Sequence, residues 1–329
     1  MTWLRRLLLS LLVLIVAGAA LAGGAWYWAQ RYLHEPGPLR EPAVVEVPRG
    51  AGLAGIADRL GEAGAIEHPQ AFVLLARLTG QDRDLRAGEY EVGPGMSPVE
   101  ILGLLQSGKV LLHPIAVPEG LTVAEVFRLL ADSDVLAGDL PPLPPEGTLL
   151  PETYLVPRGE PRAAVVERMR SGMSAALDEL WARRRQDLVL KTPHEALTLA
   201  SIIEKETALP EEYRLVSAVF HNRLKKGMRL QTDPTVIYGL TNGQGPLGRA
   251  LTRADLETDH PYNTYKVPGL PPGPIANPGR GALAAALDPA PVDYLYFVAN
   301  GDGGHTFAAT LAEHNRNVSR WRELQRQVP

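Results

Sequence analysis

The chain has 329 residues, of which 45% are hydrophobic and 21% charged, so its composition is that of a globular protein of about two domains. These values exclude a wholly disordered, collagen-like or multi-span membrane protein, and the formal net charge of −4 disfavours nucleic-acid binding, which requires a clustered basic surface. The absence of cysteine excludes disulfides and a thiol nucleophile. Because the eight histidines lack zinc-site spacing and nucleotide-binding motifs are missing, we expect no metal and no cofactor.

An uncharged stretch begins close to the N-terminus. Residues 7–28 supply 22 positions without a charge, and a helix of that length spans about 33 Å, enough to cross the hydrocarbon core of a bilayer. Because Arg5 and Arg6 precede it, the positive-inside rule predicts a cytosolic N-terminus and an extracytoplasmic remainder. We assign residues 1–34 to a cytosolic tip and one transmembrane signal-anchor helix; the alternative is a cleaved signal peptide ending near Ala22.

Residues 35–42 carry three prolines and indicate a linker. A local pattern then recurs three times: an alternating strand, a turn and an amphipathic helix, with the turns ending at Gly50, Gly95 and Gly120. Small units of this kind, with a VPxG turn before the helix, resemble LysM modules, which bind N-acetylglucosamine polymers. We therefore assign residues 43–136 to a LysM-like, βα-rich domain, with an ordinary α+β domain as the alternative.

The second half is predicted to form a separate domain. Four prolines in residues 137–151 indicate an extended connection, and we assign residues 152–329 to a helix-led α+β domain with a small sheet. A helix with an apolar stripe is predicted over 162–185. The strings YLYFVA, NGDGG and HTF, at residues 294–307, predict a β-hairpin.

The clearest helix start is Thr192, which is followed by proline at the first helical position and by glutamate three residues on. The helix is predicted to run to about Ala208 and is apolar on nearly every side, so it is expected to be buried. Glu204 shares its face with small residues, whereas Glu206 points about 200° away, so the two cannot form a catalytic pair.

A carboxyl in an apolar wall has a raised pKa and can act as a general acid near neutral pH, so Glu204 is the candidate acid. The alternative is a salt bridge from Glu204 to an arginine such as Arg223 or Arg229.

Further candidates for substrate binding follow this helix, each with a structural alternative. Asp233 is an expected helix cap, and Asn263 and Asn277 are expected to satisfy loop backbone if they do not bind sugar. His305 either joins the site or fixes its turn. The complete set of candidate substrate-binding residues is Gln231, Asp233, Tyr238, Asn263, Tyr265, Asn277 and His305.

A resemblance to a known family adds to this evidence for the candidate residues. The strings ASIIEKET, HNRL, RLQTDPTVIYG, LTRADL, PYNTY, GLPPGPIANPG and YLYFVANGDGGHTF, in this order between residues 148 and 320, closely resemble the endolytic murein (peptidoglycan) transglycosylases, the MltG/YceG-like family. The resemblance implies that Glu204 is the catalytic acid of an enzyme anchored in the bacterial inner membrane. It also implies peptidoglycan strands as substrate, and glycan polymerases or penicillin-binding proteins as partners.

The expected reaction is cleavage of the β-1,4 bond between N-acetylmuramic acid and N-acetylglucosamine, with formation of a 1,6-anhydro end. Because the muramyl 6-hydroxyl is the nucleophile, one glutamate is sufficient. One alternative is a hydrolytic muramidase that uses Asp233 or Asp255 as the second carboxylate. The other is a membrane-anchored, non-catalytic scaffold that binds glycan.

Overall fold

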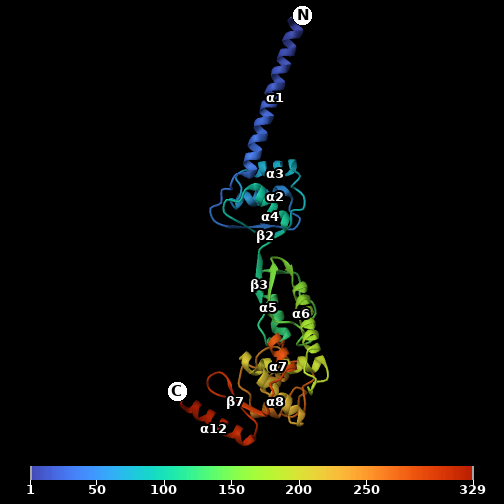
Figure 1. The fold of residues 1–329 in the computed structure, drawn as a ribbon, viewed down its shortest axis with the longest axis vertical. Helices are drawn as coiled ribbons and strands as arrows, with labels where there is room; N and C mark the ends of the chain where they lie inside the picture. Colours follow the sequence, from blue (N-terminus) through green and yellow to red (C-terminus); the bar gives the residue numbers. More distant parts are fainter. Residues whose placement is uncertain (1, 328–329) are drawn as a thin grey trace. The chain divides into compact units, whose positions relative to one another are not determined.

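The computed structural model describes residues 2–327 and divides them into two compact units (Figure 1). Unit 1 comprises the chain up to His113 together with Val156–Gly159. Unit 2 comprises Pro114–Leu155 and the chain from Glu160 onward. Helices predominate and the described strands pair into two-stranded sheets, so the predicted α+β class with an N-terminal apolar helix and small sheets is confirmed.

Unit 1 pairs its strands antiparallel, with Val45 opposite Tyr90, and packs its helices against this pair around a core that includes Ile56, Phe72 and Leu105. Its elements are α1 (Thr2–His34), β1 (Ala43–Val47), α2 (Leu53–Glu62), α3 (Pro69–Leu78), β2 (Gly88–Val92) and α4 (Pro98–Ser107). A LysM identity for residues 43–136 is not tested by this arrangement and stays a prediction.

Helix α1 agrees with the apolar segment that the sequence predicts. Over Trp3–His34 it is long and apolar enough to cross a membrane. Its side chains are exposed along most of its length, and only the last turns pack against the rest of unit 1, through Ala29 and Leu33.

Unit 2 holds the remaining elements, and its helices enclose a second hydrophobic core. These elements are β3 (Leu112–Ala116), which starts at the end of unit 1, α5 (Val123–Ala131), β4 (Leu136–Ala137), β5 (Thr153–Pro157), whose last two residues belong to unit 1, β6 (Glu160–Pro161), α6 (Arg162–Ala182), α7 (Pro193–Glu206), the 3₁₀ helix η1 (Pro210–Glu212), α8 (Tyr213–Lys225), α9 (Asp233–Thr241), α10 (Arg253–Glu257), α11 (Arg280–Leu287), β7 (Tyr296–Ala299), β8 (His305–Ala308) and α12 (Leu311–Gln327).

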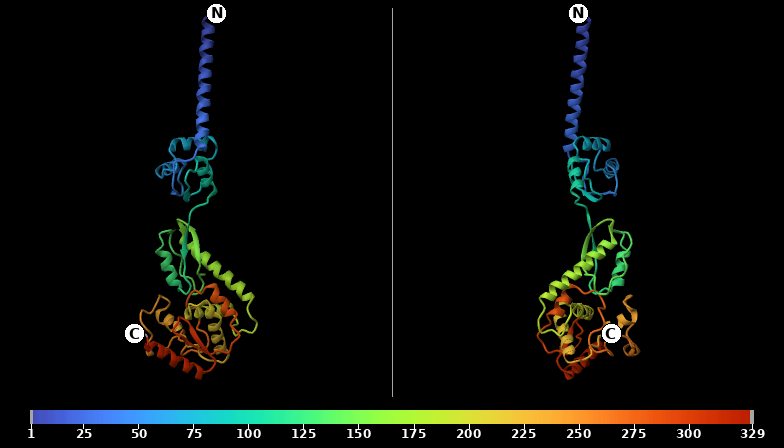
Figure 2. Two further views of the ribbon diagram at one scale, coloured as in Figure 1. Left: turned by 60° about the vertical axis from the view of Figure 1, so that its left-hand side comes forward. Right: turned by 90° about the vertical axis from the view of Figure 1, so that its right-hand side faces the viewer.

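Helix α7 is the centre of unit 2, as its all-round apolar sequence predicts. It contacts α6, α8, α9 and α11, and its residues from Ala196 to Ile203 are all buried. The predicted hairpin is also confirmed, because β7 and β8 pair antiparallel with Phe297 opposite Phe307. Helix α12 packs on this hairpin at the C-terminal end of the described chain (Figure 2).

All three predicted strand–turn–helix repeats form, at β1–α2, β2–α4 and β3–α5. Their turn glycines, Gly50, Gly95 and Gly120, have positive φ values of 79°, 66° and 76°, which side chains other than glycine rarely adopt. The third repeat nevertheless belongs to unit 2, where the amide of Gly120 donates to the carbonyl of Asn277 at 2.9 Å. The expected domain boundary at residues 137–151 stays a prediction.

Candidate active site

Glu204 lies two residues before the end of α7, the helix at the centre of unit 2. The helix begins where the sequence predicts, because the Thr192 hydroxyl accepts a hydrogen bond from the amide of Glu195 and Pro193 occupies the first turn. It ends at Glu206, where Thr207 takes an extended conformation. Glu204 is therefore held by a buried, regular helix while its own side chain remains partly accessible.

Both carboxyl oxygens of Glu204 accept hydrogen bonds. The Tyr213 hydroxyl donates to Oε1 at 3.0 Å, and the backbone amide of Gly279 donates to Oε2 at 2.8 Å. Burial raises the pKa of Glu204 above its ordinary value, and although these two hydrogen bonds act in the opposite direction, the net shift is upward. The carboxyl is thus fixed in orientation and retains its proton to a higher pH than an exposed glutamate.

The Glu204 side chain lines a pocket of about 350 Å³. The described lining comes from the end of α7, the start of α8 and the turn before α5, and consists of Glu119, Gly120, Glu204, Lys205, Glu206, Thr207, Ala208 and Tyr213. The ammonium of Lys205 donates to the carbonyl of Gly120 at 3.1 Å, which fastens this turn to α7.

Glu119 is a site residue that the sequence analysis missed. Its side chain lies against Gly279, where an added Cβ would stand 1.7 Å from Glu119 Oε1, and its negative charge contributes to the raised pKa of Glu204. One available signal was the repeat itself, since the position before the turn glycine is Arg49 in the first repeat and Pro94 in the second. A glutamate there departs from both.

Glu206 also lines the pocket, although its carboxyl has different partners from that of Glu204. The Thr232 hydroxyl donates to it, and burial raises the pKa of Glu206 to about 7. The described lining of this pocket therefore includes two glutamates from the end of α7, Glu204 and Glu206, and a third, Glu119, from the turn before α5.

His305 is tied to Glu212 and does not face the Glu204 carboxyl. Its backbone amide donates to Glu212 Oε1 at 2.6 Å, and its Nδ1 lies 2.7 Å from Glu212 Oε2. The Thr207 hydroxyl donates to the same carboxylate. Burial favours a higher pKa for Glu212, but the hydrogen bonds from His305 outweigh it and hold the pKa below its ordinary value. His305 therefore secures the β7–β8 turn against the end of α7.

The predicted cap role of Asp233 is wrong. Helix α9 starts at Asp233 with Thr232 at the cap position, and the Asp233 carboxylate instead accepts a hydrogen bond from the Tyr265 hydroxyl at 2.6 Å. Gln231, next to the cap, has a φ of 50°, an uncommon conformation for a residue with a side chain. The backbone amide of Gln231 donates to the carbonyl of Thr264, so this segment is hydrogen-bonded to the loop that carries Tyr265.

Tyr238 lies on α9 beside a second pocket of about 380 Å³. Its ring contacts that of Tyr262, with centroids 4.8 Å apart, and its hydroxyl is 3.4 Å from Glu146 Oε2. Burial raises the pKa of Glu146 to about 7. Because Lys205 lines both this pocket and the Glu204 pocket, the two pockets adjoin at Lys205.

Asn263 and Asn277 bind loop backbone in this structure, and their assignment as sugar ligands stays a prediction. Both are buried. Asn263 donates to the carbonyls of Leu256 and Thr258 and accepts from the amide of Tyr265. Asn277 donates to the carbonyl of Leu121 and accepts from the amide of Leu149. Since these bonds use donors and acceptors of both amides, the two residues hold loops together.

The structure also decides between the alternatives for other charged residues. Arg223 donates to the carbonyls of Leu230 and Leu295, and Arg229 to that of Tyr265, which replaces the suggested salt bridge to Glu204. Asp255 is the third residue of α10 and completes a capping box with Thr252, the cap residue. It also forms an ion pair with Arg249, whose hydrogen bond holds the pKa of Asp255 well below its ordinary value.

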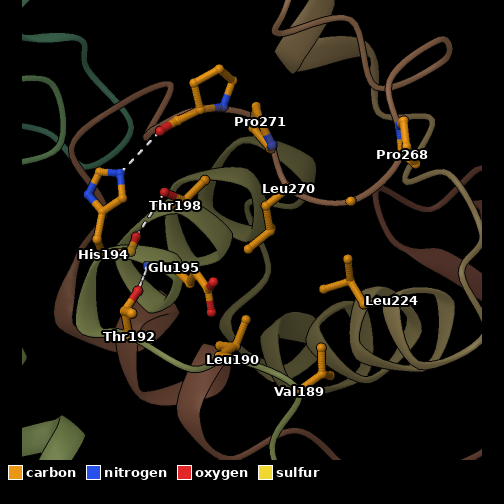
Figure 3. Close-up of a pocket in the computed structure, with 12 residues that line it drawn as sticks. Val189, Leu190, Thr192, His194, Glu195, Thr198, Leu224, Pro268, Leu270 and Pro271 are labelled. Atoms are coloured by element: carbon orange, nitrogen blue, oxygen red, sulfur yellow. Dashed lines mark hydrogen bonds between the residues drawn. The ribbon is translucent and has the colours of Figure 1, made fainter.

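A third pocket, of about 530 Å³, lies near the start of α7 (Figure 3). It is bounded by His194, Thr198, Leu224 and the loop 268–272, and the ring Nε2 of His194 lies 3.2 Å from the carbonyl of Pro272. Its described lining includes none of the catalytic or substrate-binding residues predicted from the sequence. We assign no chemistry to it.

Comparison with known proteins relates this site to a family. A curated Bacillus subtilis protein named endolytic murein transglycosylase is 32% identical over 329 aligned positions, which cover 89% of each chain. A Streptococcus pneumoniae protein of the same name is 29% identical over 92% of this chain, and the match spans 63% of that longer protein.

A crystal structure of a YceG-like protein from Listeria monocytogenes is also similar. It superposes with a TM-score of 0.53 at 32% identity, over 84% of this chain and 99% of that one. The sequence profile of the YceG-like family matches residues 45–320, which include parts of both units and every described residue that lines the Glu204 pocket. This chain belongs to the YceG-like family.

Proposed function

We propose that the chain is a membrane-anchored endolytic lytic transglycosylase that cleaves the bond between N-acetylmuramic acid and N-acetylglucosamine within peptidoglycan strands. The observation that carries the proposal is the Glu204 carboxyl, which lies in an open pocket, is oriented by Tyr213 and Gly279, and has a pKa that burial raises above its ordinary value. The relatives named endolytic murein transglycosylase support the substrate class.

Glu204 acts as the general acid and then as the base. The protonated carboxyl transfers its proton to the glycosidic oxygen as the bond from that oxygen to the muramyl anomeric carbon breaks. The muramyl 6-hydroxyl attacks the anomeric carbon, and its proton passes to the Glu204 carboxylate. The products are a 1,6-anhydro-muramyl end and a free 4-hydroxyl on N-acetylglucosamine, and Glu204 is again protonated.

The Glu204 pocket and the pocket beside Tyr238, which adjoin at Lys205, supply room for sugars on both sides of the scissile bond. Tyr238 lines the second of these pockets and offers a ring face to a sugar. Gln231 and Asp233 flank Thr232, whose hydroxyl reaches Glu206 at the rim of the Glu204 pocket, and Tyr265 holds Asp233. We assign these four residues to substrate contact and His305 to support of the rim.

Helix α1 anchors the enzyme in the inner membrane, with the N-terminus cytosolic and both units outside the cytoplasm. Its length and apolarity, and the arginines that precede its uncharged stretch, support this topology. A tethered enzyme reaches newly made, membrane-proximal glycan, so we assign to it the limitation of strand length beside the glycan polymerases and penicillin-binding proteins. The LysM-like region is proposed to bind the same strands.

The test is mass spectrometry of the fragments that the full-length protein, in detergent, releases from purified peptidoglycan. Wild type is expected to make 1,6-anhydro-muramyl ends. The Glu204→Gln variant keeps the shape of the side chain but has no acidic proton, so cleavage is expected to fall at least about 10²-fold. Glu211→Gln, an exposed glutamate in η1, is the matched control and is expected to retain wild-type cleavage.

Reducible muramic ends would instead identify a hydrolase. In that case Glu119 or Glu206, which share the pocket with Glu204, become the candidates for the carboxylate that activates water. Equal cleavage by wild type and Glu204→Gln would contradict the assignment of the acid. Absence of cleavage by folded wild type would favour a glycan-binding scaffold.

A further inference from the structure

Helix α3 lies at the foot of α1, at the end of unit 1 from which α1 departs, and strand β2 lies at the opposite end of the unit (Figure 1). The contact between the two helices is specific. Leu33 and Ala29 of α1 are buried against Leu75 of α3. The Tyr32 hydroxyl donates to the carbonyl of His68, the residue that precedes α3.

Aromatic rings reinforce the same junction. Trp28 stacks on Tyr32 with centroids 5.6 Å apart, and the His68 ring lies 5.8 Å from that of Tyr32 and 6.4 Å from that of Trp28. The start of α3 is therefore fixed beside Trp28, the last residue of the uncharged stretch.

The level of this contact relative to a bilayer follows from helix geometry. Trp26, Tyr27 and Trp28 end the uncharged stretch, where aromatic side chains occupy a membrane interface. Leu33 is five residues further on, a rise of about 7.5 Å along the helix. The headgroup layer is about 5–8 Å deep on each side, so α3 meets α1 at headgroup level.

On α3, two large apolar side chains are mostly exposed. Leu74 is 58% exposed and Leu78, one turn later, is 69% exposed, whereas Phe72 and Ala76 face the core of unit 1 and Leu75 packs against α1. Arg77 is exposed beside them. An exposed apolar pair next to a basic residue is the pattern of a helix that lies in a membrane interface, with its leucines in the acyl boundary and its cation among anionic headgroups.

We propose that α3 lies in the bilayer interface, with Leu74 and Leu78 inserted into lipid, so that unit 1 is seated on the membrane surface and not merely tethered above it. The inference rests on the proposed membrane insertion of α1. The occupant of the exposed face is the outer leaflet of the membrane that α1 crosses, because α3 packs against the end of that helix.

The absence of native cysteine makes a site-specific test direct. Single cysteines are introduced as Leu74→Cys and Leu78→Cys in the full-length protein, labelled with an environment-sensitive fluorophore, and reconstituted into vesicles of phosphatidylethanolamine with a minority of phosphatidylglycerol. Val44→Cys in β1 is the matched control, an aliphatic residue that is 55% exposed and pairs with Glu91 of β2, the strand that Figure 1 shows at the end of the unit opposite α3. Leu14→Cys, within α1, reports the membrane interior.

The expected result is a blue shift of the labels at positions 74 and 78, together with quenching by lipids that carry a quencher near the headgroup, while the label at position 44 behaves as it does in detergent-free water. Labels at 74 and 78 that match the label at 44 would overturn the interfacial helix, even if the label at 14 proves α1 to be inserted. A water-exposed label at 14 would overturn the proposed anchoring and the inference with it, so the two failures are distinguishable.

Discussion

Glu119 and Tyr213 act on the Glu204 carboxyl in opposite directions. The carboxylate of Glu119 disfavours ionisation of Glu204 by charge repulsion, whereas the Tyr213 hydroxyl stabilises the ionised form by donating to it. The pKa of Tyr213 is itself raised, first by burial and then by Glu204, so the phenol stays a donor. Since a general acid must carry its proton, the pH range of activity depends on both neighbours.

Glu119→Gln should move the alkaline limb of the pH profile to lower pH. The substitution keeps the size of the side chain and removes its charge, so the pKa of Glu204 falls and its proton is lost at a lower pH. The expected displacement of the limb in kcat/KM is a few tenths to about one pH unit, as for a single nearby charge. Steady-state cleavage of peptidoglycan measured across pH gives the result.

Tyr213→Phe is the control, because it is expected to shift the pKa of Glu204 in the opposite direction. It removes the donor to Glu204 Oε1 while the buried ring stays in place, so the alkaline limb should move to higher pH as the overall rate declines. If both substitutions move the limb in the same direction, or neither does, these neighbours do not set the ionisation of Glu204.

At the level of single residues, the sequence predicts those site residues whose position depends on the periodicity of their own helix. Glu204 follows from a capped, buried helix that presents one carboxyl on a small-residue face. Glu119 is 85 positions away from Glu204 along the chain, and only the folded contact brings its turn to the end of α7. For Asn263 and Asn277 the residue type fits sugar binding and backbone bonding equally well; both are buried and bonded to backbone, and sugar binding by either stays a prediction.

At the level of elements, capping residues and glycine turns predict the helices and strands of the three repeats, because those signals act within a few residues. They do not predict which strands pair. β1 pairs with β2 across 40 residues, whereas β3 pairs with β5, and this choice places the third repeat in unit 2. Helix α3 lies between two repeats and lacks the glycine turn that marks the others, and it is absent from the predicted elements.

The close approach of the turn before α5 to the start of α11 predicts a coupling between Gly279 and Glu119. In Gly279→Ala the new Cβ would stand 1.7 Å from Glu119 Oε1 and 2.2 Å from its Cδ, so the glutamate must move. We expect kcat/KM to fall about tenfold, equivalent to about 1.4 kcal/mol. In a Glu119→Ala background there is no carboxylate to displace, and Gly279→Ala should then have a much smaller effect.

A double-mutant cycle in peptidoglycan cleavage measures this coupling. Gly103→Ala in α4, where an added Cβ meets no atom within 4 Å, is the control for a harmless glycine replacement. Equal effects of Gly279→Ala with and without Glu119 would show that its cost arises elsewhere, for instance in the hydrogen bond from the Gly279 amide to Glu204.

At the scale of the whole chain, the end of α1 packs into the first folded unit. The last turns of α1 contribute Ala29 and Leu33 to a buried cluster with Leu75 of α3, and Tyr32 packs against it. A chain cut at the predicted linker, residue 35, would therefore remove part of the hydrophobic core of unit 1. The end of α1 is a structural part of that unit.

Two soluble fragments test this, one of residues 27–329 and one of residues 35–329. Loss of Leu33 from its buried site should cost about 2 kcal/mol of local stability, so the amides of α3 are expected to exchange hydrogen about 30-fold faster in the shorter fragment. Mass spectrometry of hydrogen–deuterium exchange gives the rates, and the amides of α7 in unit 2 are the internal control and should exchange equally in both. Identical protection of α3 in the two fragments would mean that the end of α1 only rests on unit 1, and the domain would then begin at the linker.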